Sequence, residues 1–414
     1  MKKTLIIALL SLCISMVTFS QSHDEAKRWV QELSSSRYYG RGYVKNGCNK
    51  AAKYLAKEMR SLGLKSFGRS YYQTFDIAVN TFPSRMHVSI DGKVLEPGID
   101  YIIHPASHSM KGTFTPMFLP DSIGDSLTMP IPPNSIPIWS TKNKQRFYES
   151  KAEQDAIYIG DRCTWSVARQ QKPFCRLMIW DGIIDSQSAN IHIDYKATFK
   201  KNYTIRNVIG FIPGSVCPDS MIVFTAHYDH LGCIGRNTYY PGASDNATGT
   251  AMVLDLARYY VQNPHKAYYT MVFVLLAGEE AGICGAKHNT ENPIWDFDKT
   301  RFLVNLDMVG SGSEGITIVN STEFPHAFQD LCDNNKRKSL LPKISPRGPS
   351  CNSDHCPYYE NGIPSFFIYT NGPEGSEYHS ITDTYDKVKF TGYKALFILL
   401  TDFVKQIEKT TYDR

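Results

Sequence analysis

The sequence predicts an α/β protein with a mixed, mostly parallel central sheet flanked by helices, and with a β-rich insertion domain. Three observations support this fold class. Residues 221–226, 270–278 and 302–306 are apolar runs, which is typical of strands buried on both faces. Such strands alternate with helical periodicity from residue 203 onward. Helical periodicity is scarce in residues 82–199.

The first 20 residues have the pattern of a secretory signal peptide. Lys2 and Lys3 precede an apolar stretch, which gives way to small polar residues ending at Ser20. A membrane anchor is the alternative, but the apolar run is short and no later stretch approaches spanning length. We therefore expect an exported protein, periplasmic or secreted from a bacterial envelope, with no stable membrane insertion after signal removal.

Composition indicates a large globular chain without a nucleic-acid role. The 414 residues are 42% hydrophobic and 21% charged, which is enough for a large core. The net charge is +5, or +3 (5 − 2) once Lys2 and Lys3 leave with the signal. The one basic run, residues 336–338, is explained by a solvated helix end.

Cysteine usage fits an oxidising compartment. Nine of the ten cysteines remain after Cys13 leaves with the signal, and this odd number requires at least one free thiol. Cys351 and Cys356 bracket Asp354 and His355. This pair is interpreted either as a disulfide that fixes a loop at the site or as two unpaired thiols.

The predicted catalytic domain comprises residues 21–81 and 200–414. Its first part has helical spacing at residues 24–33 and 48–62, and Gly63 ends the second helix. The last helix, residues 391–408, carries one apolar stripe.

Residues 82–199 are predicted to form the β-rich insertion. Residues 86–95 indicate a hairpin that turns on Asp91 and Gly92. A proline-rich passage follows, through Pro130 and Pro137. We expect this unit to cover part of the active-site cleft and so to limit the length of the substrate. The alternative is a surface unit with no part in the site.

Polar residues begin where the three buried runs end. His227 and Asp229 follow the first run, Glu279 and Glu280 the second, and Asp307 the third. Ligands bind at the carboxyl ends of strands in open α/β sheets, so these side chains should meet in one crevice.

Two further residues complete the candidate metal site. Asp245 precedes an apolar helical run, and His379 follows a strand-like run at residues 363–370. The candidate metal ligands, all imidazoles or carboxylates as zinc prefers, are His227, Asp245, Glu280, Asp307 and His379. A set of more than four ligands without thiolates fits two metal ions that share one carboxylate better than a closed structural site.

The neighbours of the ligands suggest two catalytic roles. Glu279 stands beside a ligand and is the natural general base for an attacking water. Asp229, two residues after His227, is placed to accept the second N–H of that imidazole and so fix its tautomer.

Taken singly, these motifs carry little information, since a Glu-Glu pair usually begins a solvated helix. The occurrence of several such motifs directly after buried strands indicates a functional site.

The histidines to which we assign structural, hydrogen-bonded roles are His230, His288 and His355. The residues expected to support the loop or the substrate are Tyr378, Asp383 and Asp386.

Six ordered motifs carry a family resemblance, between residues 208 and 388: AHYDHLG, GASDNATG, AGEEAGICGAKH, NLDMVG, SDHCPYYENGIPSFF and YHSITDTYDKV. They resemble the di-zinc aminopeptidases of the bacterial leucyl aminopeptidase type. That family also contains glutamate carboxypeptidases, the transferrin receptor and glutaminyl cyclases. The resemblance implies the zinc aminopeptidase, or phosphorylase/hydrolase-like, fold.

The resemblance also implies an arrangement of two Zn²⁺ ions per chain. One ion would be held by His227, Asp245 and Asp307, and the other by Asp245, Glu280 and His379. Asp245 would bridge them, with Glu279 as the base and Asp229 as the orienting residue. Relatives further imply a cis peptide bond between Asp245 and Asn246, and a protease-associated-like module at the position of residues 82–199.

The expected function is that of an exported metal-dependent exopeptidase, most simply a di-zinc aminopeptidase that removes N-terminal residues from peptides. One alternative is an acyltransferase resembling the glutaminyl cyclases, which use a single zinc. Another is a non-catalytic binding protein on the same fold, although no ligand is missing here. Metal content and substrate assays separate the three; specificity and oligomeric state are not encoded in these motifs.

Overall fold

The computed structural model describes residues 23–120, 130–140, 144–150, 153–161, 164–375, 377–408, 410 and 412. The predicted signal peptide, residues 1–20, lies outside the described residues. Among the described residues, no helix combines the length and apolar character needed to cross a membrane.

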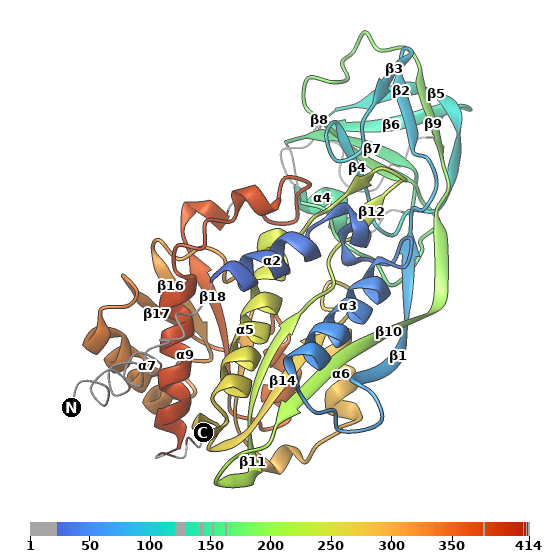
Figure 1. Ribbon diagram of the computed structural model, residues 1–414. Coiled ribbons are helices and arrows are strands. Elements are labelled where there is room, and N and C mark those ends of the chain that lie inside the picture. Colours follow the sequence, from blue (N-terminus) through green and yellow to red (C-terminus); the bar gives the residue numbers. More distant parts are fainter. Residues whose placement is uncertain are drawn as a thin grey trace, which may run out of the picture.

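An eight-stranded mixed sheet forms the centre of the larger part of the molecule (Figure 1). In spatial order its strands are β1 (Tyr72–Thr81), β10 (Thr198–Ile212), β14 (Tyr269–Leu276), β11 (Cys217–His227), β15 (Thr300–Leu306), β18 (Ser365–Asn371), β16 (Gly315–Val319) and β17 (Ile344–Arg347). The four central strands β14, β11, β15 and β18 are mutually parallel. The predicted mostly parallel sheet is therefore confirmed at its centre, and β1, β10 and β16 add antiparallel pairs.

Helices cover both faces of this sheet. The helices are α2 (His23–Leu33), α3 (Gly47–Leu62), α5 (Thr248–Gln262), α6 (Cys284–Glu291), α7 (Pro325–Lys338), α8 (His355–Glu360) and α9 (Tyr393–Ile407). The side chains of α2, α3, α5, α7 and α9 share one core with one face of the central strands. Residues of α6 and α8 pack on the opposite face. Strand β14 is buried along its whole length, as expected of a strand covered on both faces.

Local signals place the helix ends close to where the sequence predicts them. Gly63 follows α3 with φ +90°, and its N–H bonds to the carbonyl of Arg60. Helix α5 begins at Thr248, and the side-chain oxygen of Asn246 accepts the N–H of Gly249. That bond satisfies a donor in the first turn.

A second sheet lies apart from the first, at the top of Figure 1. In spatial order its strands are β3 (Lys93–Leu95), β2 (His87–Ile90), β9 (Ile191–Tyr195), β5 (Met110–Leu119), β6 (Ser135–Ser140), β7 (Ala156–Gly160), β8 (Arg176–Trp180) and β4 (Tyr101–Ile103). Short helix α4 (Lys144–Glu149) accompanies them. The insertion is thus β-rich, as predicted, and β2 and β3 form the expected hairpin around Asp91 and Gly92.

Two long strands connect the sheets. Strand β1 pairs antiparallel with β10 as far as Thr81 opposite Thr198, and the chain between these residues builds the second sheet (Figure 1). The remaining strands, β12 (Cys233–Ile234) and β13 (Thr238–Tyr239), form a small hairpin in the loop after β11. Phe82 and Leu231, from the two parts of the chain, share one apolar core with the second sheet.

Candidate metal centre

The carboxyl ends of three adjacent parallel strands bring most of the predicted site residues together. His227 is the last residue of β11, and Asp307 follows β15 directly. Glu279 and Glu280 follow β14 after a two-residue turn at Ala277 and Gly278. Since β14, β11 and β15 are neighbours with the same direction, these polar side chains share one edge of the sheet.

Asp245 lies in a short irregular turn (Ala243–Ala247) between the β11 loop and α5, and its peptide bond to Asn246 is cis, as predicted. The carboxylate is almost fully buried. Its Oδ1 lies 3.3 Å from Nε2 of His227, and its Oδ2 lies 3.2 Å from Nε2 of His379. The two oxygens of one carboxylate therefore face two different imidazoles.

The five predicted ligands form two groups that share Asp245. In the first group, Nε2 of His227 also lies 3.2 Å from Oδ1 of Asp307. In the second, Nε2 of His379 lies 3.1 Å from Oε2 of Glu280. Each group presents one imidazole nitrogen and carboxylate oxygens to a common point. This donor set of nitrogen and oxygen atoms without thiolates fits two divalent ions of the zinc type.

The charge distribution also favours bound cations. Burial lowers the pKa of His379, but Glu280 and Asp245 outweigh it and raise that pKa to about 11. Burial raises the pKa of Glu280, but His379 and His230 outweigh it and lower that pKa to about 2. The Glu280 carboxylate therefore stays ionised, and the negative potential that retains a proton on the His379 imidazole also attracts divalent metal ions, which compete with that proton.

Asp229 is fully buried and holds the site together, though in a different way from the one predicted. Its backbone carbonyl, 3.2 Å from Nδ1 of His227, is the nearer acceptor for that imidazole, and its carboxylate Oδ1 is 3.9 Å away. The carboxylate instead accepts the N–H of Glu279 at 3.1 Å and the hydroxyl of Tyr43 at 3.0 Å. It thus links the loop of His227 to the loop of Glu279.

The environment of Glu279 favours the neutral form of its carboxyl group. Burial raises its pKa well above the ordinary value, and Glu280, Asp354 and Asp307 act in the same direction, against the lowering effect of His227. A raised pKa brings a carboxylate closer to the working range of a general base.

Ser353 orients the predicted metal ligand Asp307 and is not among the residues that the sequence predicts for the site. Its hydroxyl donates to Oδ2 of Asp307 at 2.8 Å and accepts the side-chain N–H of Asn305, also at 2.8 Å. Such hydrogen bonds aim a ligand and tune its basicity. Ser353 precedes Asp354 and His355 in one of the family motifs, but a serine has no ligand chemistry to single it out.

Arg41 is a second residue that the sequence did not reveal. It is fully buried, and all five of its N–H donors bond to backbone carbonyls. The acceptors are those of Tyr228 (2.6 Å), Leu33 (3.0 Å), Pro241 (2.7 Å), Gly242 (2.7 Å) and Asp245 (3.2 Å). One side chain from before α3 therefore fixes both ends of the loop between His227 and Asp245.

Of the three histidines assigned structural roles, only His230 lies within the site. Its Nδ1 is 2.7 Å from Oε1 of Glu280 and 3.8 Å from Oδ2 of Asp245, so it bonds to a predicted ligand. The His288 ring stacks on Phe75, and the His355 ring lies against Phe367.

A pocket of about 570 Å³ is lined by residues that are next in sequence to three of the predicted ligands. Ser244, Met308 and Tyr378, each next in sequence to a predicted ligand, line it together with Thr370, Pro373 and Glu314. The Tyr378 ring is half-exposed and stacks on the His379 ring, with centroids 3.8 Å apart. The pocket has mixed polarity, and Glu314 is its one charged residue among the described lining residues.

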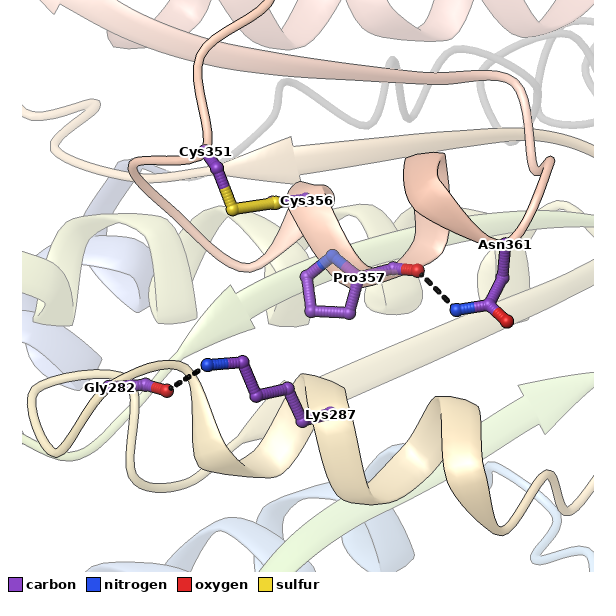
Figure 2. Close-up of a disulfide and its surroundings, with 6 residues drawn as sticks. All are labelled: Gly282, Lys287, Cys351, Cys356, Pro357 and Asn361. Carbon is purple, nitrogen blue, oxygen red and sulfur yellow. Dashed lines mark hydrogen bonds between the residues drawn. A yellow bond between two sulfur atoms is a disulfide. The ribbon is translucent and has the colours of Figure 1, made fainter.

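Cys351 and Cys356 form a disulfide, the first of the two predicted alternatives (Figure 2). The bond joins the loop before α8 to the first turn of that helix, and α6 runs alongside (Figure 2). Ser353 lies within this closed loop. Among the described cysteines, Cys48, Cys175, Cys217, Cys233, Cys284 and Cys332 are free thiols.

Parts of this chain are similar in sequence to proteins named as aminopeptidases. "Leucine aminopeptidase 1" of Arthroderma otae is 28% identical over 246 residues, which are 55% of this chain and 64% of the relative. "Aminopeptidase YwaD" of Bacillus subtilis is 26% identical over 195 residues, 45% of this chain and 41% of the relative. The match thus spans less than two thirds of each of these relatives.

Solved structures share the fold over nearly the whole chain. A zinc aminopeptidase from Bacillus subtilis superposes with a TM-score of 0.70 at 20% identity, covering 94% of this chain and 96% of the other. An aminopeptidase from Aneurinibacillus gives a TM-score of 0.63 at 18% identity, covering 95% and 94%.

The model of "Peptidase family M28" matches residues 207–404. This segment contains all five candidate metal ligands, Glu279 and Asp229. Residues 207–404 are therefore similar to peptidase family M28.

Proposed function

We propose that this protein is an exported di-zinc aminopeptidase that hydrolyses N-terminal residues from peptides. The observation that carries the proposal is the orientation of Asp245, whose two oxygens each face one complete ligand group. His227, Asp245 and Asp307 would hold one ion, and Asp245, Glu280 and His379 the other. The match of residues 207–404 to peptidase family M28 supports a peptidase, and the relatives named as aminopeptidases support the removal of N-terminal residues.

When bound, the two ions would polarise the scissile carbonyl and lower the pKa of an attacking water towards about 7. Glu279 accepts a proton from this water at its carboxylate as the water oxygen attacks the carbonyl carbon. It then donates that proton to the amide nitrogen as the C–N bond breaks. The products are the free N-terminal amino acid and the shortened peptide.

The pocket beside the ligand groups would receive the side chain of the substrate's first residue. Three of its lining residues are next in sequence to Asp245, Asp307 and His379, so a side chain bound there would place the following peptide bond near these predicted ligands. Because Met308, Pro373 and Tyr378 supply apolar surface, the pocket would accept large side chains.

We also propose that residues 1–20 direct export and that the mature chain has two units, a catalytic domain of residues 21–81 and 200–414 and an insertion of residues 82–199. The antiparallel pairing of β1 with β10 supports this division, because it brings both ends of the insertion together at one place.

Elemental analysis of the mature protein, beside assays with aminoacyl, dipeptidyl and N-terminal glutamine substrates, tests the proposal. We expect about two zinc ions per chain and chelator-sensitive release of N-terminal residues. One zinc with cyclisation of glutamine would replace the proposal with a cyclase, and no metal with no turnover would replace it with a binding protein.

A further inference from the structure

The second sheet's part of the chain makes direct contact with a predicted metal ligand. Nδ1 of His379 lies 3.0 Å from the backbone carbonyl oxygen of Trp165, and the backbone N–H of Trp165 donates to the carbonyl of His379 at 3.3 Å. Trp165 lies 214 residues before His379, in the loop between β7 and β8. These two hydrogen bonds tie the two segments together in both directions.

The contact determines how the His379 ring can bind a metal. A carbonyl oxygen only accepts hydrogen bonds, so Nδ1 must carry the proton when it bonds to Trp165. A neutral imidazole with its proton on Nδ1 has its lone pair on Nε2. That nitrogen faces Asp245 and Glu280, at 3.2 and 3.1 Å.

The Trp165 backbone is itself anchored by its side chain. The indole is 5% exposed, and its Nε1–H donates to the carbonyl of Ile103, in β4, at 2.8 Å. Its ring stacks on Tyr240, from the loop after β11, with centroids 5.1 Å apart and an interplanar angle of 23°. Trp165 is therefore held by both parts of the molecule and cannot shift without breaking buried contacts.

We propose that Trp165 is a positioning residue of the site formed by Asp245, Glu280 and His379, and that the insertion is thereby a structural part of this metal site. The inference rests on the proposed two-metal function. It assigns the insertion a role in metal binding, in addition to any effect that it has on substrate access.

Zinc titration of the metal-free protein tests this inference without any substrate. Trp165→Ala should weaken one of the two zinc-binding steps by about 10- to 100-fold and leave the other unchanged. Trp165→Phe, which keeps the stacking on Tyr240, should recover most of the affinity. Trp180→Ala is the matched control, since Trp180 is also buried in the insertion and its Nε1–H also donates to a backbone carbonyl, that of Ile99.

Wild-type affinity at both steps in Trp165→Ala, or an equal loss in Trp180→Ala, would overturn the inference. Failure of the wild type to bind two ions would instead overturn the proposed function. Should Trp165→Ala not fold, the ¹⁵N NMR spectrum of the histidine-labelled, zinc-loaded wild type tests the inference instead. We expect His379 to carry its proton on Nδ1 and to bind zinc through Nε2, and the reverse arrangement would refute the positioning role.

Discussion

The carboxylate of Asp383 holds the backbone that carries Asp245. Its Oδ2 accepts the N–H of Asp245 at 3.0 Å, and its Oδ1 accepts the N–H of Ser244 at 2.8 Å. The Asp383 carbonyl accepts a third bond, from Ala243. The loop that contains His379 therefore also fixes the orientation of the carboxylate proposed to bridge the two ions.

Asp383→Asn should weaken zinc binding about tenfold or more, with a similar loss of peptidase activity. The amide keeps one acceptor oxygen but turns an N–H donor towards a backbone N–H, so one of the two side-chain hydrogen bonds is lost. Zinc titration and kcat/KM measure the effect. Asp386→Asn, at a nearby exposed carboxylate, is the control, and equal behaviour of the two variants would contradict the prediction.

Glu279→Gln should retain its zinc and lose about 10²- to 10⁴-fold in kcat. The amide has nearly the same shape as the carboxylate but cannot accept a proton from water. Zinc content and steady-state kinetics should be measured together. Glu291→Gln, at an exposed position in α6, should behave as wild type, and a Glu279→Gln variant with near-normal turnover would exclude this residue as the base.

Arg41→Met should lower the free energy of unfolding by roughly 3 kcal/mol or more, because five buried carbonyls lose their donor. Arg41→Lys should cost less, since an ammonium group can still supply three of the five hydrogen bonds. Urea unfolding of the metal-free protein measures both. Arg37→Lys, at a largely exposed arginine that pairs with Glu32, should change stability by less than about 0.5 kcal/mol. Similar values at the two positions would show that the Arg41 hydrogen bonds are not important for stability.

Replacing both Cys351 and Cys356 by serine should destabilise the protein by about 2 kcal/mol, the chain-entropy value for so short a loop. It should also weaken zinc binding, since the loop contains Ser353, which orients Asp307. Urea unfolding and zinc titration report the two effects separately. Cys332→Ser removes a free, partly buried thiol of α7 for comparison. Unchanged zinc affinity in the double variant would mean that Ser353 keeps its position without the disulfide.

Acid should destabilise the second sheet through His104. Burial, with a further contribution from Arg176, lowers the pKa of His104 from 6.5 to about 4. As the pH falls, the unfolded chain therefore binds a proton at His104 before the folded chain does. The contribution of the neutral His104 to the free energy of unfolding is complete above about pH 6.5 and is lost as the pH falls towards 4. One pH unit of pKa difference corresponds to about 1.4 kcal/mol, so the loss should reach roughly 3 kcal/mol.

Urea unfolding between pH 7 and pH 4 tests this expectation. His104→Gln, which keeps a side-chain acceptor for the N–H of Ala106 but does not titrate, should flatten the pH dependence in that range. His87→Gln, in β2 of the same sheet, is the control. An unchanged pH dependence in His104→Gln would show that other groups control acid unfolding.

The amino-acid sequence was enough to predict the central sheet and the five candidate metal ligands that the fold brings together. The buried strands are continuous apolar runs, and the functional residues follow directly where those runs end, as at His227 and Asp307. Parallel neighbouring strands place their ends at one edge, so local pattern alone predicted which side chains would meet.

Only the tertiary structure revealed the residues that support those ligands. Arg41, Ser353 and Trp165 act through hydrogen bonds to backbone carbonyls or to a neighbouring carboxylate, across up to 214 positions of sequence. Such bonds depend on where the chain brings a donor or acceptor, and not on a side chain with metal-binding chemistry. For the same reason the hydrogen bond of His227 goes to the carbonyl of Asp229 and not to its carboxylate. Residue type sets what a ligand can bind, and long-range packing sets how firmly and in which tautomer it is held.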